Sequence, residues 1–151
     1  MFSSYIYESW RETQYEKYAF LLERLPGFFN GNILDIGCGD NFLKQYLQAR
    51  NIDTEIIGVD INGGDITADA GNLPFPDECF EKIICVDALH LFNADIRVLK
   101  KGGLMLASIF FNDGNYEEKR RMLLDKLSNM KIMKEFIFDG REKELFVLAR
   151  K

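Results

Sequence analysis

The spacing of hydrophobic positions changes between two periods along the chain, and it predicts helices and strands in alternation. Apolar residues recur at intervals of three and four from Glu12 to Leu25, which predicts an amphipathic helix ended by Pro26 and Gly27. Short apolar, β-branched runs are typical of buried parallel strands, and they occur at Asn32–Ile36, Glu55–Ile61, Lys82–Val86 and Leu104–Phe111. Helical spacing follows the first and the last of these runs, over Phe42–Leu47 and Tyr116–Leu127.

The C-terminal part of the chain has a different pattern. Two apolar runs, Glu135–Phe138 and Glu144–Ala149, are separated by five polar or glycine residues, which predicts an antiparallel hairpin. The chain has no internal repeat and no linker composition. We therefore expect one α/β domain over residues 1–151, with a mostly parallel, Rossmann-like sheet, flanking helices and a C-terminal antiparallel hairpin.

A glycine turn follows the first predicted strand. Gly37 and Gly39 stand where that strand must reverse sharply into a helix, and glycine permits positive φ and a close approach of a ligand to the backbone. Asp60 ends the next strand at the same sheet edge, where its carboxylate can accept hydrogen bonds from both hydroxyls of a ribose. Together these features predict an adenosine site. Taken singly, the turn also fits a tight strand-to-helix reversal without a ligand, and Asp60 also fits a solvated strand end.

The segment from about Asn32 to Ile109 resembles the class I, Rossmann-like S-adenosylmethionine-dependent methyltransferases, particularly the small-molecule branch called type 11. Asp35-x-Gly37-x-Gly39 is similar to the first motif of that family, and Gly58–Ile61 to the second. Asp69-Ala70, followed by Leu73-Pro74-Phe75-Pro76-Asp77, resembles the segment that frames the adenine. The resemblance implies S-adenosylmethionine as the cofactor, and it implies these cofactor-binding residues: Asp35, Gly37, Cys38, Gly39, Asp60, Ile61, Asp69, Ala70 and Asp87.

The resemblance also implies methyl transfer to an acceptor, which we expect to be a small molecule. His90, the only histidine, follows the predicted fourth strand, where some family members place a general base. Local packing or capping is the other interpretation of this histidine. One histidine and scattered carboxylates predict no metal site. The sequence identifies neither the acceptor nor the accepting atom.

Three departures from the family pattern are visible. Asn41 replaces the usual third glycine, and Asn tolerates left-handed backbone geometry better than most residues. The helix between the second and third strands is missing, so Ile66–Asp69 is expected to form a hairpin arm or a loop and not a parallel neighbour of Glu55–Ile61. The helix before Leu104 is expected to be cut to about two turns, over Asn93–Lys100.

Two other functions are alternatives to methyl transfer. A dinucleotide-binding fold requires G-x-G-x-x-G, but Phe42 stands where the third glycine would fall. The other alternative is a non-catalytic protein on a degenerate methyltransferase fold that binds the cofactor or a partner. An exposed sheet edge in such a trimmed fold would allow a homodimer or a partner protein to pair with it.

Composition limits the class of protein further. Acidic residues outnumber basic ones by 24 to 19, giving a net charge of −5, so the overall charge offers no support for nucleic-acid binding. Three cysteines without zinc-ligand spacing, together with the lack of a signal-peptide pattern, predict a cytoplasmic protein. No 18-residue apolar run predicts a membrane span. The first 18 residues are rich in aromatic residues, which we expect to form part of the core or a lid: Tyr5, Tyr7, Trp10, Tyr15 and Tyr18.

Overall fold

A computed structural model describes residues 4–151, apart from the side chains of residues 4, 5 and 7. The helices are α1 (Ser4–Arg24), α2 (Phe42–Ala49) and α3 (Tyr116–Lys126), with short 3₁₀ helices η1 (Leu89–Leu91) and η2 (Ile96–Val98). The strands are β1 (Asn32–Ile36), β2 (Glu55–Asp60), β3 (Gly63–Gly64), β4 (Ile66–Thr67), β5 (Phe80–Cys85), β6 (Leu99–Phe111), β7 (Lys131–Asp139) and β8 (Lys143–Arg150). Within the described residues, no helix has the length and apolar character needed to cross a membrane.

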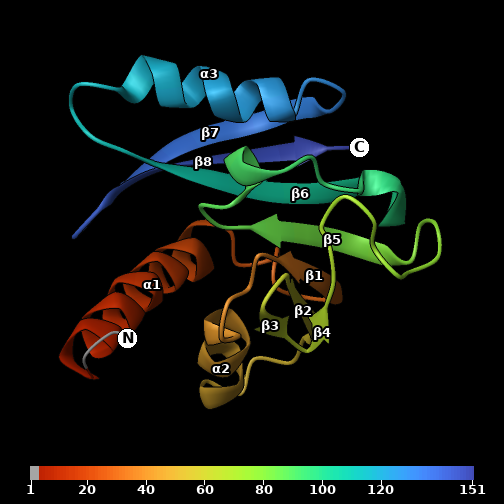
Figure 1. The fold of residues 1–151 in the computed structure, drawn as a ribbon, viewed down its shortest axis with the longest axis horizontal. Coiled ribbons are helices and arrows are strands. Elements are labelled where there is room, and N and C mark those ends of the chain that lie inside the picture. The colour runs from red at the N-terminus through yellow and green to blue at the C-terminus, as the bar shows by residue number, and fades with distance from the viewer. Residues whose placement is uncertain (1–3) are drawn as a thin grey trace.

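Seven strands form one mixed sheet in the order β4-β2-β1-β5-β6-β8-β7 (Figure 1). Neighbouring strands pair in parallel through the first five positions of this order, β4-β2-β1-β5-β6. Strand β8 runs antiparallel to both β6 and β7. This arrangement confirms the predicted fold class, including the C-terminal hairpin. Two elements are longer than the sequence pattern indicated: α1 begins at Ser4, and β6 begins at Leu99.

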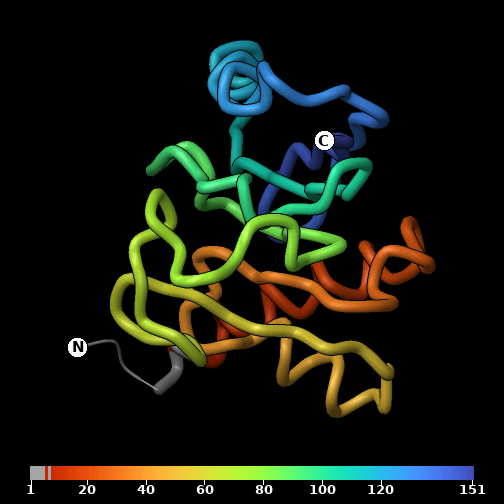
Figure 2. Tube along the Cα trace, turned by 90° about the vertical axis from the view of Figure 1, so that its right-hand side faces the viewer, coloured from red at the N-terminus to blue at the C-terminus, as the bar shows by residue number. Residues whose placement is uncertain are grey.

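The sheet separates two hydrophobic clusters, one under each layer of helices. On one face, α1 and α2 bury Leu21, Leu43 and Leu47 against strand residues such as Phe146. On the other face, α3 packs Leu123 and its neighbours against β6 and β8, and η1 and η2 cover the adjoining part of this face. Figure 2 shows α3 end-on at the top and α2, in gold, at the bottom of the same view. The result is a three-layer α/β structure.

The connection between β2 and β4 replaces the helix that the family pattern would place there, and within the described residues it contains no helix. β4 pairs in parallel with the end of β2, through Val59↔Ile66 and Asp60↔Thr67. The expectation that Ile66–Asp69 is not a parallel neighbour of β2 was therefore wrong. A pairing of two residues needs no full crossover, because Gly64, at φ 78°, turns the chain back along β2 before β4 begins.

Asp65 stabilises this tight connection through both its backbone and its side chain. Its backbone N–H donates to the Gly58 carbonyl at 2.8 Å, and its carboxylate accepts the Gly58 N–H at 2.8 Å. The same carboxylate pairs with Lys44 of α2 at 2.9 Å. The Gly58 amide keeps the pKa of Asp65 below its ordinary value, with a further contribution from Lys44. One aspartate thus ties the connection to β2 and to α2.

The segment before β6 also differs from the expected two-turn helix. Asn93–Lys100 contains only the single 3₁₀ turn η2, and a second 3₁₀ turn, η1, precedes it. Arg97 fixes this segment by donating to the Leu73 and Phe75 carbonyls and by pairing with Asp77 at 2.6 Å. The prediction of an α-helix there was wrong, because these contacts to a neighbouring loop replace the hydrogen bonds of a regular helix.

A buried ion pair joins α1 to the sheet. The Lys17 side chain is fully buried, and its Nζ lies 2.8 Å from Glu142 Oε2 and 3.0 Å from the equally buried Glu144 Oε2. Glu144 Oε1 accepts a hydrogen bond from the Ser108 hydroxyl at 2.9 Å, and Ser108 Oγ in turn accepts the Asp87 N–H at 3.0 Å. Burial raises the pKa of Glu144 to about 7. The network therefore runs from α1 through β8 and β6 to the end of β5.

Replacing Lys17 by Met should leave the buried Glu144 carboxylate without its counter-charge. We expect the free energy of unfolding at pH 8 to fall by roughly 3–5 kcal/mol, measured by urea denaturation. The loss should shrink below pH 7, where Glu144 takes up a proton. The double variant K17M/E144L removes both charges and should recover most of the stability. An equal loss of stability at pH 8 and at pH 5 would contradict the assignment of Glu144 as the buried partner of Lys17.

Candidate functional site

A cavity of about 490 Å³ opens at the carboxyl ends of the parallel strands β1 and β2, beside the segment that follows β5. Its walls come from five parts of the chain: α1, the glycine turn, the end of β2, the segment after β4 and η1. The lining residues are Trp10, Ile36, Gly37, Gly39, Val59, Asp60, Ile61, Ala68, Asp69, Ala70, Ala88, Leu91 and Phe92. Ligands of open α/β sheets bind at this edge.

The glycine turn adopts the backbone geometry that the sequence predicts. Gly37 and Gly39 have φ of 76° and 56°, and Asn41 sits in the left-handed region at φ 60° and ψ 39°. The Gly37 N–H donates to the Val59 carbonyl at 2.8 Å, which fixes the turn to the end of β2. A Cβ on Gly37 would lie 2.8 Å from Ala88 Cβ, so no larger residue fits there. The prediction that Asn41 preserves the turn is confirmed.

Gly39 keeps the cavity open toward α1. A Cβ on this residue would meet only the Trp10 ring, at 4.0 Å. Any larger side chain at this position would therefore project into the cavity. The Gly39 N–H donates to Asp60 Oδ2 at 2.9 Å, and the Asn62 N–H donates to Asp60 Oδ1 at 3.0 Å. A carboxylate has about four acceptor positions. Asp60 therefore retains acceptor capacity for a ligand's hydroxyl groups.

The far end of the cavity is formed by residues after β2 and β4. Ile61 is 64% exposed and lies beside Asp60. Asp69 caps its own turn by accepting the Gly71 N–H at Oδ1, 2.9 Å away, while Ala70 is buried beneath. These three predicted residues share the cavity with Gly37, Gly39 and Asp60, so six of the nine predicted cofactor-binding residues meet in one place.

Asp35 and Cys38 lie on the other side of the glycine turn. They line a small cavity of about 70 Å³ together with Trp10 and Tyr18 of α1. Burial, together with the nearby Asp60 and Asp65 carboxylates, raises the pKa of Asp35 to about 7. Burial likewise raises the pKa of the Cys38 thiol to about 12. This thiol is therefore protonated at neutral pH and unreactive.

Asp87 and His90 are not among the residues that line either cavity. Asp87 adopts a left-handed backbone at φ 52°, and its carboxylate accepts the Phe110 N–H of β6 at 2.9 Å. His90 is half-buried in η1, and its Nδ1 is buried without a hydrogen-bond partner. The roles assigned to these two residues stay predictions. No group of three potential metal ligands occurs within residues 4–151 as described.

Sequence reasoning did not identify the cavity residues Leu91 and Phe92 of the η1 region, and it named Trp10 of α1 only as part of the core or a lid. Trp10 lines both cavities and packs edge-on against Phe42, with ring centroids 5.2 Å apart. Leu91 and Phe92 of the η1 region line the larger one. The N-terminal aromatic cluster was the only available signal. Within that cluster Tyr15 and Tyr18 pack on Tyr46 of α2, whereas the side chains of Tyr5 and Tyr7 lie outside the described residues.

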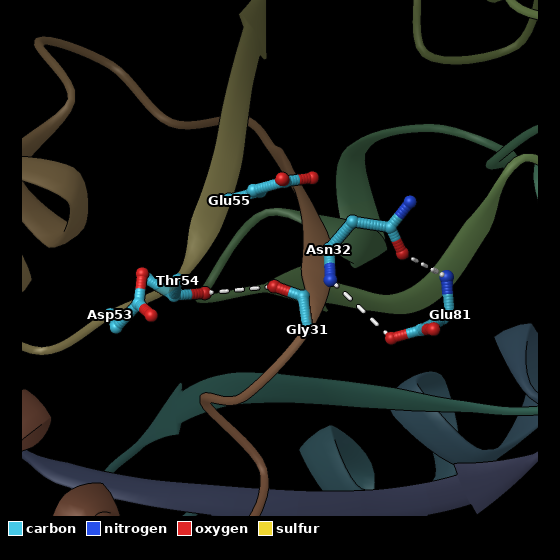
Figure 3. A pocket seen from close by; sticks show the side chains of 6 residues that line it. All are labelled: Gly31, Asn32, Asp53, Thr54, Glu55 and Glu81. Atoms are coloured by element: carbon cyan, nitrogen blue, oxygen red, sulfur yellow. Dashed lines mark hydrogen bonds between the residues drawn. The ribbon is translucent and has the colours of Figure 1, made fainter.

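A separate cavity of about 320 Å³ lies at the opposite, amino edge of the sheet (Figure 3). Its polar groups bond largely to one another: Thr54 donates to the Gly31 carbonyl at 3.1 Å, and the Glu81 N–H donates to Asn32 Oδ1 at 2.8 Å. These bonds hold the starts of three strands together. We assign this cavity a structural role.

Comparison with known proteins identifies the family. The family described as a methyltransferase domain, type 11, matches residues 34–107, which span the glycine turn, Asp60 and Asp69. This segment of the chain therefore matches the type 11 class I methyltransferases. The family agrees with S-adenosylmethionine as the expected cofactor, and the glycine cradle and the remaining acceptor capacity of Asp60 fit that molecule.

A sequence relative and the solved structures differ in the function that their names give. The rat protein named arginine-hydroxylase NDUFAF5, mitochondrial, is 32% identical over 103 residues, covering 56% of this chain and 30% of that protein. The chain thus spans less than a third of the length of this curated relative. An S-adenosylmethionine-dependent methyltransferase from Methanosarcina mazei has a TM-score of 0.65 at 17% identity, covering 82% of this chain and 93% of that chain.

A further solved structure contains a partner protein. It is a complex between the Haloferax volcanii Trm112 methyltransferase activator and a methyltransferase, and it matches with a TM-score of 0.63 at 14% identity, covering 95% of both chains. At such low identities these structures establish the methyltransferase fold alone.

Removing the charge of Asp35 should stabilise the methyltransferase domain at alkaline pH. Because the pKa of Asp35 is raised from 3.8 to about 7 on folding, the folded state binds this proton more tightly, and stability falls as pH rises through that window. Asp35→Asn should therefore unfold at a higher temperature than the parent at pH 8, with the difference shrinking toward pH 4. Thermal melts across this range test it.

The exposed Asp53 offers a matched control for that comparison. Asp53→Asn should change the free energy of unfolding by less than about 0.5 kcal/mol at any of these pH values. A lower melting temperature for Asp35→Asn at pH 8 would contradict the burial argument.

Proposed function

We propose that this methyltransferase-family chain binds S-adenosylmethionine in the 490 Å³ cavity and transfers its methyl group to a small molecule. The observation that carries the proposal is the meeting of the glycine turn, Asp60 and Asp69 on that one cavity. These residues come from segments up to about thirty positions apart, and each provides a group suited to a different part of an adenosyl ligand.

Each residue has a distinct task in this proposal. Asp60 accepts hydrogen bonds from the ribose hydroxyls, Asp69 accepts from the adenine amine, and the lack of side chains at Gly37 and Gly39 admits the amino-acid end. Asp35, behind the turn, supplies negative charge near that end. The cofactor supplies an already activated methyl group, so the main task of the chain is to align the acceptor and exclude water.

A non-catalytic role is the second candidate. The rat relative is named for hydroxylation, and another protein of this fold is bound to an activator, so the fold supports other chemistry and partner binding in those proteins. In this chain, β4 and β7 are the strands at the two edges of the sheet, and β7 exposes Ile132, Met133 and Ile137. A homodimer or a partner protein at an edge, and a cytoplasmic location, stay predictions.

Calorimetric titration of S-adenosylmethionine and S-adenosylhomocysteine tests the cofactor site. Micromolar binding is expected, and Asp60→Ala should weaken it roughly tenfold to a hundredfold, because the lost hydrogen bonds to a charged group are worth about 1.5–3 kcal/mol. Asp60→Asn keeps an oxygen that can accept the Gly39 N–H, so the glycine turn is retained. Weaker binding by this variant would therefore report the lost contact with the ligand and not a disrupted turn.

Asp53→Ala, in the cavity of Figure 3, should bind the cofactor as the parent does. Absence of heat for both ligands, with an unchanged melting temperature, would refute cofactor binding and favour the non-catalytic role.

A further inference from the structure

The segment that carries Asp69 has little regular structure to hold it in place. It begins where β4 ends, and β4 pairs with β2 through only two residue pairs. Residues 68–79, all of which the structure describes, form no helix and no strand. A carboxylate that recognises one group of a ligand has to be held at a defined position by the residues around it. Contacts from another part of the chain therefore have to fix this segment.

Asp95, in the segment before β6, makes two of these contacts. Its backbone N–H donates to the Ala70 carbonyl at 2.8 Å, and its side-chain Oδ2 accepts the Leu73 N–H at 3.2 Å. The side chain is only 17% exposed, so water competes little for the second bond. Because Ala70 follows Asp69 directly, one residue holds both ends of the turn at 70–73 beside the cavity.

Arg97 holds the Asp95 carboxylate in this position. Its guanidinium lies 3.1 Å from Asp95 Oδ2, the same oxygen that accepts the Leu73 N–H. The guanidinium also donates to the Leu73 carbonyl at 3.2 Å. The ion pair therefore binds the backbone of Leu73 through both its N–H and its C=O, and the buried part of the Asp95 side chain keeps a counter-charge.

The turn connects these contacts to the Asp69 side chain. Asp69 Oδ1 accepts the Gly71 N–H at 2.9 Å, and the Asp69 carbonyl accepts the Asn72 N–H at 3.0 Å. A Cβ on Gly71 would lie 3.2 Å from the Asn93 carbonyl oxygen, so the segment that leads to Asp95 packs closely on the turn. A carboxylate has about four acceptor positions, so Asp69 can still accept a bond from a ligand.

We propose that Asp95 is a positioning residue that, through Asp69, makes the cofactor site selective for adenine; this inference rests on the proposed function. In that function Asp69 accepts a hydrogen bond from the adenine amine. Asp95 acts by fixing the turn from which Asp69 reaches the cavity, and not by contact with the ligand. When the turn moves, the amine loses its acceptor, whereas Asp60 at the end of β2 still binds the ribose.

Two ligands that differ only in the amine measure this selectivity. By calorimetry, the parent should bind S-adenosylhomocysteine about tenfold more tightly than its analogue with purine in place of adenine, because the analogue lacks the donor for a charged acceptor. Asp95→Ala should reduce this ratio of affinities to less than about threefold. Asp95→Asn keeps an oxygen that can accept the Leu73 N–H, so it should retain most of the preference.

The ratio of affinities distinguishes positioning from a general loss of stability. Both ligands are titrated into one preparation, so an unfolded fraction affects both measurements equally. Asp69→Ala should abolish the preference, and adding Asp95→Ala should lower it no further, because the two residues act through one contact. Glu135→Ala removes a different ion pair, with Arg120 at the far edge of the sheet, and should keep the parent ratio.

Arg97→Gln supplies a second variant, because it removes the support of the Asp95 carboxylate, and it should lower the ratio in the same direction. A parent-like ratio in Asp95→Ala, or in Arg97→Gln where Asp95→Ala does not fold, would overturn the proposal. An equal loss of preference in Asp95→Asn or in Glu135→Ala would overturn it too.

The parent itself separates this inference from the proposed function. If it binds S-adenosylhomocysteine without preference over the purine analogue, the role of Asp95 is refuted and the cofactor site stands. If it binds neither ligand, the proposed function is refuted, and this inference with it.

Discussion

The ion pair between Lys17 and Glu144 is the contact on which the arrangement around the cavity depends. It connects α1, which carries Trp10, to β8, and it continues through Ser108 to the backbone at the end of β5. Helix α1 also packs Phe20 on Phe136, Phe138 and Phe146 of the C-terminal hairpin, whereas exposed pairs such as Arg141–Glu12 contribute little. Burying a lysine is costly unless its charge is balanced. The position of α1 is therefore coupled to the correct assembly of two strands far away in the sequence.

Local sequence determines much of this fold directly. Each buried strand is an apolar run, and the backbone of the glycine turn follows from residues that tolerate positive φ, with Asn41 in place of a glycine. Asp60 could be placed because strand ends of a parallel sheet share one edge, whereas Asp69 was predicted only from the resemblance to the family's adenine segment. Element ends were less predictable, since β6 continues back through Gly102 and Gly103 to Leu99, where the pattern alone indicates a turn.

The features that could not be predicted depend on contacts between distant segments. The pairing of β4 with β2 requires Asp65 to bind the Gly58 backbone, and the 3₁₀ turn η2 requires Arg97 to bond loop carbonyls. Trp10 enters the site because α1 is fixed by the Lys17 ion pair and by aromatic packing on α2 and the C-terminal hairpin. The buried Asp35 carboxylate is a local conflict that opposes folding at neutral pH and above, as is common for groups retained for binding. Such conflicts are invisible in hydrophobic periodicity.

The Asp65 side chain also has a consequence for the behaviour of the chain in a crowded solution. Unpaired sheet edges invite other molecules to add a strand, the first step toward insoluble fibrils. Beside Gly58, where the outer edge of β2 would otherwise present a bare N–H, the carboxylate occupies that donor as a neighbouring strand would, while the backbone of the same residue occupies the carbonyl. An anionic group held there by Lys44 repels like-charged neighbours as well. The loop that replaced a helix thus protects the β2 side of the sheet from the addition of a foreign strand.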